Sequence, residues 1–120
     1  MFTYSFEKLE VWQLSRSLVK TIYSITNNFP SEEKYGITSQ IRRAAISVSS
    51  NLAEGSSRKT PKEQARFTQI AFASLLELLN QLIICNDLQY ISEKELLKIR
   101  EDIEMISNKL NSLYNSQINK

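Results

Sequence analysis

Apolar residues recur every three or four positions along most of the chain, which is the spacing of one face of an α-helix. The first such segment predicts a helix over residues 6–28, and the last, in which steps of three and four alternate strictly, predicts a helix over 93–114. The stripes are Val11, Leu14, Leu18, Ile22 and Ile25 in the first segment, and Leu96, Ile99, Ile103, Ile106, Leu110 and Leu113 in the last.

Two more helices are indicated between these, over residues 32–54 and 61–87. Ser31 is a good N-cap for the first of them, and Gly55 fits the left-handed position just past its end. Thr60, Pro61 and Glu63 combine three signals of a helix start. The core face of residues 32–54 is mostly small, so a neighbouring helix can approach closely; it comprises Ile37, Ile41, Ala44, Ala45, Val48 and Leu52.

Four amphipathic helices with short connections predict an all-α, antiparallel up-down-up-down four-helix bundle. Glycine and proline occur only twice each, too rarely for an all-β fold with many tight turns. No repeat or low-complexity segment interrupts the pattern, so residues 1–120 are expected to form one domain. The polar tail after Tyr114 is expected to fray.

The helix over 61–87 carries two apolar stripes. One comprises Phe67, Ala71, Ser74, Leu75, Leu78, Leu82 and Cys85, and the other comprises Phe72, Leu76, Leu79 and Ile83. The core of a single bundle can cover only the first stripe. The second stripe therefore predicts an interface between copies of the chain.

Composition argues against most catalytic chemistry. The chain has no histidine, one cysteine and two glycines, so it cannot build a Ser-His-Asp triad, an ordinary zinc site or a glycine-rich phosphate loop. Catalysis by Arg, Glu or Ser alone has no positive signal. We expect no catalytic residues, no metal and no cofactor, with Cys85 a small core residue. Lacking a signal peptide and an uninterrupted apolar run of about 20 residues, the chain is expected to be cytoplasmic and outside the membrane.

Charge is distributed unevenly although its net value is only +2. Basic residues gather in the second and third predicted helices and the loop between them, whereas residues 87–104 are acidic. These basic side chains are candidates for contacts with nucleic-acid phosphates: Arg42, Arg58, Lys59, Lys62 and Arg66. The alternatives are a solvated loop, or ion pairs with the acidic segment of the same or another chain.

A polar face also runs along the second predicted helix, beside its apolar face. Its residues are Gln40, Arg43, Ser47, Asn51 and Glu54, and Glu77 stands among leucines of the third helix. A partly buried carboxylate needs a partner, and an arginine of the second helix could supply one. A buried polar network that fixes the packing is the favoured interpretation, and a polar binding groove is the alternative.

One long motif resembles a known family. Its parts are Phe29-Pro30, the run from Glu33 through Gly36-Ile37 and Arg42-Arg43 to Val48, and Ser50-Asn51-Leu52-Ala53-Glu54-Gly55. Leu9–Trp12 and Ala71–Leu78 are similar to the first and third helices of the same proteins. The family is that of the 23S rRNA intervening-sequence proteins of bacteria, also called S23 or four-helix-bundle proteins, and the resemblance spans about residues 6–114.

This resemblance implies a four-helix bundle that assembles into a ring, commonly a homopentamer. A related member, the accessory variability determinant of diversity-generating retroelements, is a basic pentamer that binds a reverse transcriptase and nucleic acid. The expected partners are therefore other copies of the chain, RNA or DNA, and a protein. Two functions follow: a non-enzymatic oligomer that binds nucleic-acid backbone, or a protein–protein scaffold with no nucleic-acid role.

Overall fold

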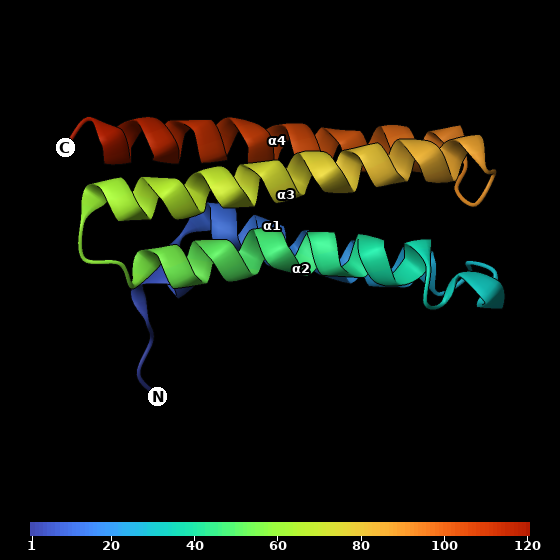
Figure 1. Cartoon of the computed structure of the whole chain (residues 1–120), viewed down its shortest axis with the longest axis horizontal. Coiled ribbons are helices and arrows are strands. Elements are labelled where there is room, and N and C mark those ends of the chain that lie inside the picture. Colours follow the sequence, from blue (N-terminus) through green and yellow to red (C-terminus); the bar gives the residue numbers. More distant parts are fainter.

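The computed structural model describes residues 1–120 and contains four α-helices and no strands. They are α1 (Glu10–Thr26), α2 (Ile37–Ser56), α3 (Pro61–Asp87) and α4 (Glu93–Ile118), with short 3-10 turns η1 (Ser5–Lys8) and η2 (Ser31–Glu33). The all-α prediction is confirmed. Figure 1 shows each helix lying alongside the others in a body whose principal extents are 45 × 29 × 21 Å.

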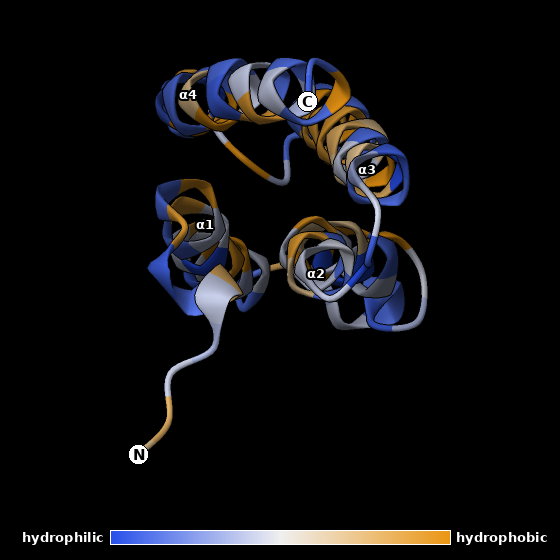
Figure 2. Ribbon diagram, turned by 90° about the vertical axis from the view of Figure 1, so that its left-hand side faces the viewer, coloured by the Kyte–Doolittle hydropathy of each residue, from blue (hydrophilic) through white to orange (hydrophobic).

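The apolar stripes meet in one core of 20 buried residues to which all four helices contribute. Seen along the long axis, α1, α2, α3 and α4 surround this core (Figure 2). The stripe of α4 is buried over five positions, from Leu96 to Leu110, and Leu113 packs against the core from its edge. Burial of these stripes is the main contribution to stability, at about 25 cal/mol for each Å² of apolar surface.

Gly55 corrects one expectation from the sequence. It lies inside α2, is buried, and does not have the left-handed conformation expected of a glycine past a helix end. A Cβ built at this position would lie 2.7 Å from Cβ of Phe67 on α3. The glycine is therefore needed because α2 and α3 approach closely, and not because the chain turns there.

Helix α2 begins at Ile37, five residues later than expected. Ser31 precedes a 3-10 turn, and Gly36 is the residue at the N-cap of the α-helix. The Glu33 carboxylate accepts hydrogen bonds from the Ile37 amide, at 3.5 Å, and from the Tyr90 hydroxyl, at 2.9 Å. This carboxylate therefore joins the start of α2 to the loop that connects α3 and α4.

The two ends of α4 differ in how well the sequence predicts them. Ser92 and Glu95 form the expected capping box. At the other end the helix does not stop at Tyr114 but continues to Ile118. The Thr68 hydroxyl of α3 donates to Oε1 of Gln117 at 2.7 Å, and this bond holds the last turn of α4 against the first turns of α3.

Helix α3 is long and apolar enough to cross a membrane by length and composition alone, with a mean hydropathy of 1.5 over its most apolar window. Core helices of water-soluble proteins meet the same criterion. Only 39% of that window is buried within this chain. The helix thus presents more apolar surface than its own bundle covers.

Replacing Gly55 by alanine tests the close approach of α2 and α3. In an unconstrained helix interior this change stabilises by roughly 1 kcal/mol. Here the added methyl group would displace Phe67, so we expect a net loss of about 1–3 kcal/mol in the free energy of unfolding, measured with urea. Ser50→Ala, on the exposed side of the same helix, is the control and should be neutral or slightly stabilising. A Gly55→Ala protein more stable than the parent would contradict this packing.

Candidate nucleic-acid interface

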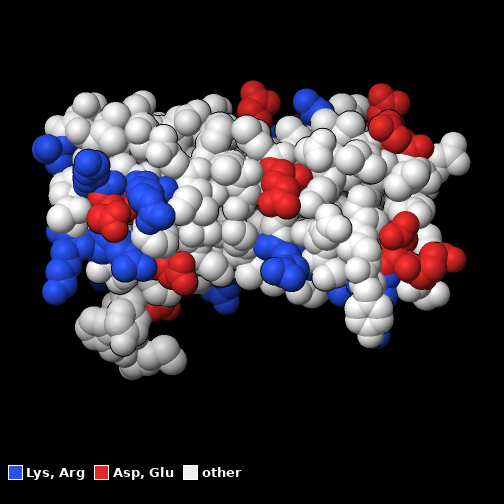
Figure 3. Space-filling view, viewed as in Figure 1, with Lys and Arg blue, Asp and Glu red and all other residues white.

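Five exposed cations gather at one end of the bundle, which we call the basic end. They come from the loop after α2, the first two turns of α3 and the C-terminus of the chain: Arg58, Lys59, Lys62, Arg66 and Lys120. Figure 3 shows blue Lys and Arg atoms crowded at the end of the molecule where α2 leads into α3, with a few red acidic atoms among them, and mainly red atoms at the opposite end.

Local hydrogen bonds hold the loop that carries these cations. The Gln64 side-chain amide donates to the Arg58 carbonyl at 2.9 Å, and the Thr60 hydroxyl accepts from the Glu63 amide at 3.2 Å as the N-cap of α3. Pro61 occupies the first position of the helix, as the sequence predicts. The basic side chains therefore extend from a fixed backbone.

Two of the arginines share one aromatic ring. The Arg58 guanidinium lies 4.5 Å from the centroid of Phe67, and that of Arg66 lies 5.8 Å from it. Stacking on a ring reduces the freedom of an arginine but leaves the N–H groups at its edge able to bind a phosphate. Phe67 itself is buried against Gly55 where α2 and α3 approach, so this helix contact positions both arginines.

The cations at the basic end have no acidic partner within the chain. The only ion pair joins Lys109 of α4 to Glu10 of α1. The acidic residues that begin α4 lie at the far end of α3, about 38 Å from Lys62 at a rise of ~1.5 Å per residue. This distance excludes the alternative in which the basic residues pair with the acidic segment of the same chain.

Arg42 does not belong to this cluster. It lies near the start of α2, roughly 21 Å along the helix from Ser56. Its Nε donates to the Thr26 hydroxyl at 2.8 Å, its Nη2 donates to Oδ1 of Asn27 at 3.3 Å, and its guanidinium stacks 4.4 Å from the centroid of Tyr23. Arg42 therefore holds the C-terminus of α1 to α2, where a cation also suits the helix dipole.

The predicted buried polar network is wrong for four of its six members. Gln40, Arg43, Glu54 and Glu77 are exposed, because they lie on the outer sides of α2 and α3. The other two form a real contact: the hydroxyls of Ser47 and Ser74 are 2.8 Å apart, and the Asn51 amide donates to Ser47 Oγ at 3.0 Å.

The exposed charges of this set remain unpaired within the chain. Arg43 makes no hydrogen bond or ion pair, and Glu77 accepts only from the Gln81 amide, at 3.3 Å. Gln40, Arg43, Ser47 and Glu77 line a shallow groove between α2 and α3. This arrangement agrees with the alternative interpretation, a polar groove, better than with a buried network.

The second apolar stripe of α3 is divided between the core and the surface. Phe72 and Leu79 are half-buried against the core of their own chain, whereas Leu76 and Ile83 are 47% and 37% exposed. Ile70 and Ile84 add to the exposed apolar surface of this helix. The predicted interface residues thus include two side chains that the bundle itself leaves partly exposed.

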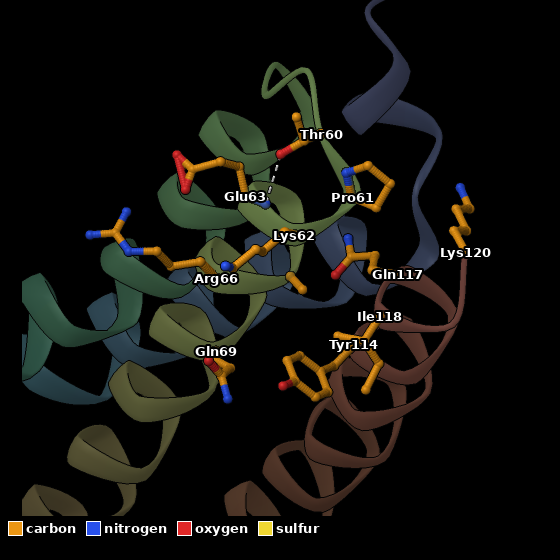
Figure 4. A pocket seen from close by; sticks show the side chains of 11 residues that line it. Thr60, Pro61, Lys62, Glu63, Arg66, Gln69, Tyr114, Gln117, Ile118 and Lys120 are labelled. Atoms are coloured by element: carbon orange, nitrogen blue, oxygen red, sulfur yellow. Dashed lines mark hydrogen bonds between the residues drawn. The ribbon is translucent and has the colours of Figure 1, made fainter.

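A groove between α3 and α4 contains residues that the sequence analysis did not select (Figure 4). Its volume is about 900 Å³, and it lies beside the basic end. Tyr114, Gln117 and Lys120 reach it because α4 continues past Tyr114 and lies along the start of α3. A helix predicted to end at Tyr114 leaves Gln117 and Lys120 in the tail, and for this reason the sequence pattern does not place them beside α3.

The opposite end holds the two groups with shifted acidity. Burial, and secondarily the nearby Glu33 carboxylate, raise the pKa of the Cys85 thiol to about 11. The hydrogen bond to Glu33 raises the pKa of the Tyr90 hydroxyl, with burial a smaller cause. Cys85 lies wholly within the core and is protonated at neutral pH, as expected of a packing residue. No group of three or more Cys, Asp or Glu side chains is placed to hold a metal ion.

Comparison with known proteins agrees with the sequence motifs. The model of the 23S rRNA-intervening sequence protein family matches residues 7–112, from η1 into α4. A crystal structure of a protein of unknown function, from the S23 ribosomal protein family of Bacteroides thetaiotaomicron, has the same fold. The TM-score is 0.77 at 20% identity, and the match covers 87% of this chain and 97% of the other. No curated protein matches the sequence.

The family match covers all of α1, α2 and α3 and most of α4, which together supply the core and all but one of the cations at the basic end. The chain belongs to the 23S rRNA-intervening sequence protein family.

Proposed function

We propose that this protein is a non-enzymatic, oligomeric protein that binds the backbone of nucleic acid through its basic end. The observation that carries this proposal is the group of five exposed cations with no acidic partner, in a chain that contains only one ion pair. The protomer is an antiparallel up-down-up-down bundle, and its copies form a cytoplasmic ring, a pentamer by resemblance to the family.

Contacts with phosphate account for the binding. Arg58 and Arg66, restrained by Phe67, offer paired N–H groups, while Lys59 and Lys62 act as flexible point charges. Such contacts carry no sequence information and set only the position of the strand. We therefore expect affinity that depends little on sequence.

A ring is needed to make this binding strong. One chain with a net charge of +2 would bind weakly at physiological salt. Each phosphate contact releases counterions from the nucleic acid, and the free energy gained from this release falls as the salt concentration rises. Repeating the basic end around a ring gives one strand several sites to engage at once. The fields of neighbouring copies also add.

Charge reversal at the basic end tests the proposal. Arg58→Glu combined with Lys62→Glu should reduce affinity for a labelled RNA at least tenfold near 50 mM salt, a condition under which phosphate contacts are strong. The measurement is fluorescence anisotropy, after light scattering has shown an unchanged oligomer. The matched control is Lys94→Glu with Lys98→Glu, which changes the net charge by the same amount at the start of α4, far from the basic end. It should bind RNA far better than the first variant.

Arg42→Ala provides a second comparison. Because this side chain joins α1 to α2, its loss should lower the stability of the fold and leave RNA affinity largely unchanged.

If the parent protein does not bind RNA or DNA even at low salt, the nucleic-acid proposal is wrong. If the Arg58 and Lys62 variant loses its assembly instead, these residues serve the oligomer.

The apolar surface of α3 favours the second candidate, a scaffold that assembles and holds a protein partner. Leu76 and Ile83 are partly exposed, and the polar groove containing Arg43 and Glu77 lies along another side of α3. A protein partner or another copy could cover this helix. The scaffold function needs no contact with phosphate, so the binding experiment above separates the two candidates.

Leu76→Asp tests the interface that both candidates share. An aspartate in a contact between copies would bury a charge, so we expect light scattering to report monomers or smaller species. Leu97→Asp is the control, because Leu97 is a similarly exposed leucine on α4. An oligomer of unchanged size for Leu76→Asp would show that the second stripe of α3 is not the interface.

A further inference from the structure

The groove between α3 and α4 combines the aromatic ring of Tyr114 with side-chain amides and cations in one open site. Figure 4 shows Tyr114 extending from α4 toward α3, with Gln69 on the facing side of α3. Lys62 and Arg66 leave α3 on one side of the groove, and Lys120 lies on the other. The volume of about 900 Å³ is in the range of sites that hold small organic ligands.

Tyr114 is well placed to offer a flat surface. It is half-buried, and its position on α4 directly follows Leu113, which packs against the core. No hydrogen bond within the chain engages its hydroxyl, and no other aromatic ring stacks on it. The bundle therefore fixes the base of the side chain and leaves the ring open to the groove.

The polar groups around the ring suit a nucleotide. Three cations and one carboxylate line the groove, and the side chains of Arg66 and Glu63 both extend away from Tyr114 along the α3 side (Figure 4). Gln69 makes no hydrogen bond within the chain. Gln117 uses its oxygen to accept from Thr68. The amide of Gln69 and the NH₂ group of Gln117 are thus available to the edge of a base.

We propose that this groove binds a nucleotide of single-stranded nucleic acid, with its base stacked on Tyr114 and its flanking phosphates on Lys62, Arg66 and Lys120. A base in a duplex is stacked between its neighbours and cannot reach such a ring, so the site selects single strands. Stacking accepts every base, and sequence preference is therefore weak. This inference rests on the proposed function and adds to it a class of ligand.

The last turn of α4 is needed to form this site. The bond from Thr68 to Gln117 joins this turn to α3, and Gln117 and Lys120 both line the groove. The groove is formed by residues more than 40 positions apart in the sequence, such as Gln69 and Tyr114. The α3 segment supplies cations but its Phe67 ring is buried, and the α4 segment supplies the accessible ring of Tyr114.

The test compares binding of a short labelled RNA, the DNA of the same sequence, and the matching DNA duplex by fluorescence anisotropy. Tyr114→Leu keeps an apolar side chain on α4 but removes the ring. It should weaken binding to both single strands by roughly 5- to 150-fold, the effect of ~1–3 kcal/mol per stacked base, and leave duplex binding unchanged. Tyr114→Phe keeps the ring and should restore binding.

Tyr35→Leu is the matched control, because Tyr35 is an exposed tyrosine at the other end of the bundle; it should bind as the parent does. Cross-linking of an RNA that contains 5-bromouridine gives a second readout, which needs no variant. The adduct is expected on Tyr114, and its identification by mass spectrometry does not depend on how a substitution affects folding.

The outcomes separate this inference from the proposed function. Equal affinity of Tyr114→Leu and the parent for single strands, or a cross-link only elsewhere, would overturn the stacking groove while backbone binding stands. Duplex binding as tight as single-strand binding in every variant would do the same. Absence of binding to all three probes at low salt would overturn both.

Discussion

At the end of α2 the backbone of Gly55 lies so close to Phe67 that no Cβ fits between them. This contact brings α2 and α3 together just before the loop that joins them, and it places the Phe67 ring beneath two arginines. Arg58 comes from the loop and Arg66 from the second turn of α3, and both stack on the Phe67 ring. The closeness of the two helices thus determines both the packing of the core and the position of the charges above it.

The charges are separated along the molecule because the helices lie lengthwise beside one another. The loop after α2 and the end of α4 meet at the basic end, whereas the acidic start of α4 is carried to the other end. The acidic start of α4 is therefore too far from the basic end to pair with it, and Glu54 and Glu63, which lie nearer, form no ion pair with these cations. Mild net charge and a distinctly basic end can coexist in one small protein for this reason.

Much of the fold can be predicted from the spacing of apolar residues alone, because a stripe with helical spacing indicates both the helix and the face that it buries. The starts of α3 and α4 were also predictable, since Thr60-Pro61 and the Ser92–Glu95 capping box act locally. The start of α2 and the end of α4 were not. Contacts between residues distant in sequence accompany both: the Tyr90 hydroxyl donates to the Glu33 carboxylate before α2, and the Thr68 hydroxyl donates to Gln117 in the last turn of α4.

In the candidate site, too, the residues close together in sequence are predictable and those brought in by packing are not. The sequence predicts the cluster of Arg58, Lys59, Lys62 and Arg66, which lie close together in it. Charge alone also selects Arg42, but this side chain bonds to Thr26 and Asn27 of the first helix hairpin and lies outside the basic end. The sequence does not place Tyr114 and Lys120 in the site, because only the pairing of α3 with α4 brings them to the basic end.

The salt dependence of RNA binding tests the central claim most directly. The logarithm of the association constant should fall linearly with the logarithm of salt concentration, and removing one cation by Arg58→Ala should make the slope shallower by about 0.7 for each protomer that engages the strand. A parent protein whose affinity does not change with salt, or an unchanged slope for Arg58→Ala, would contradict the account.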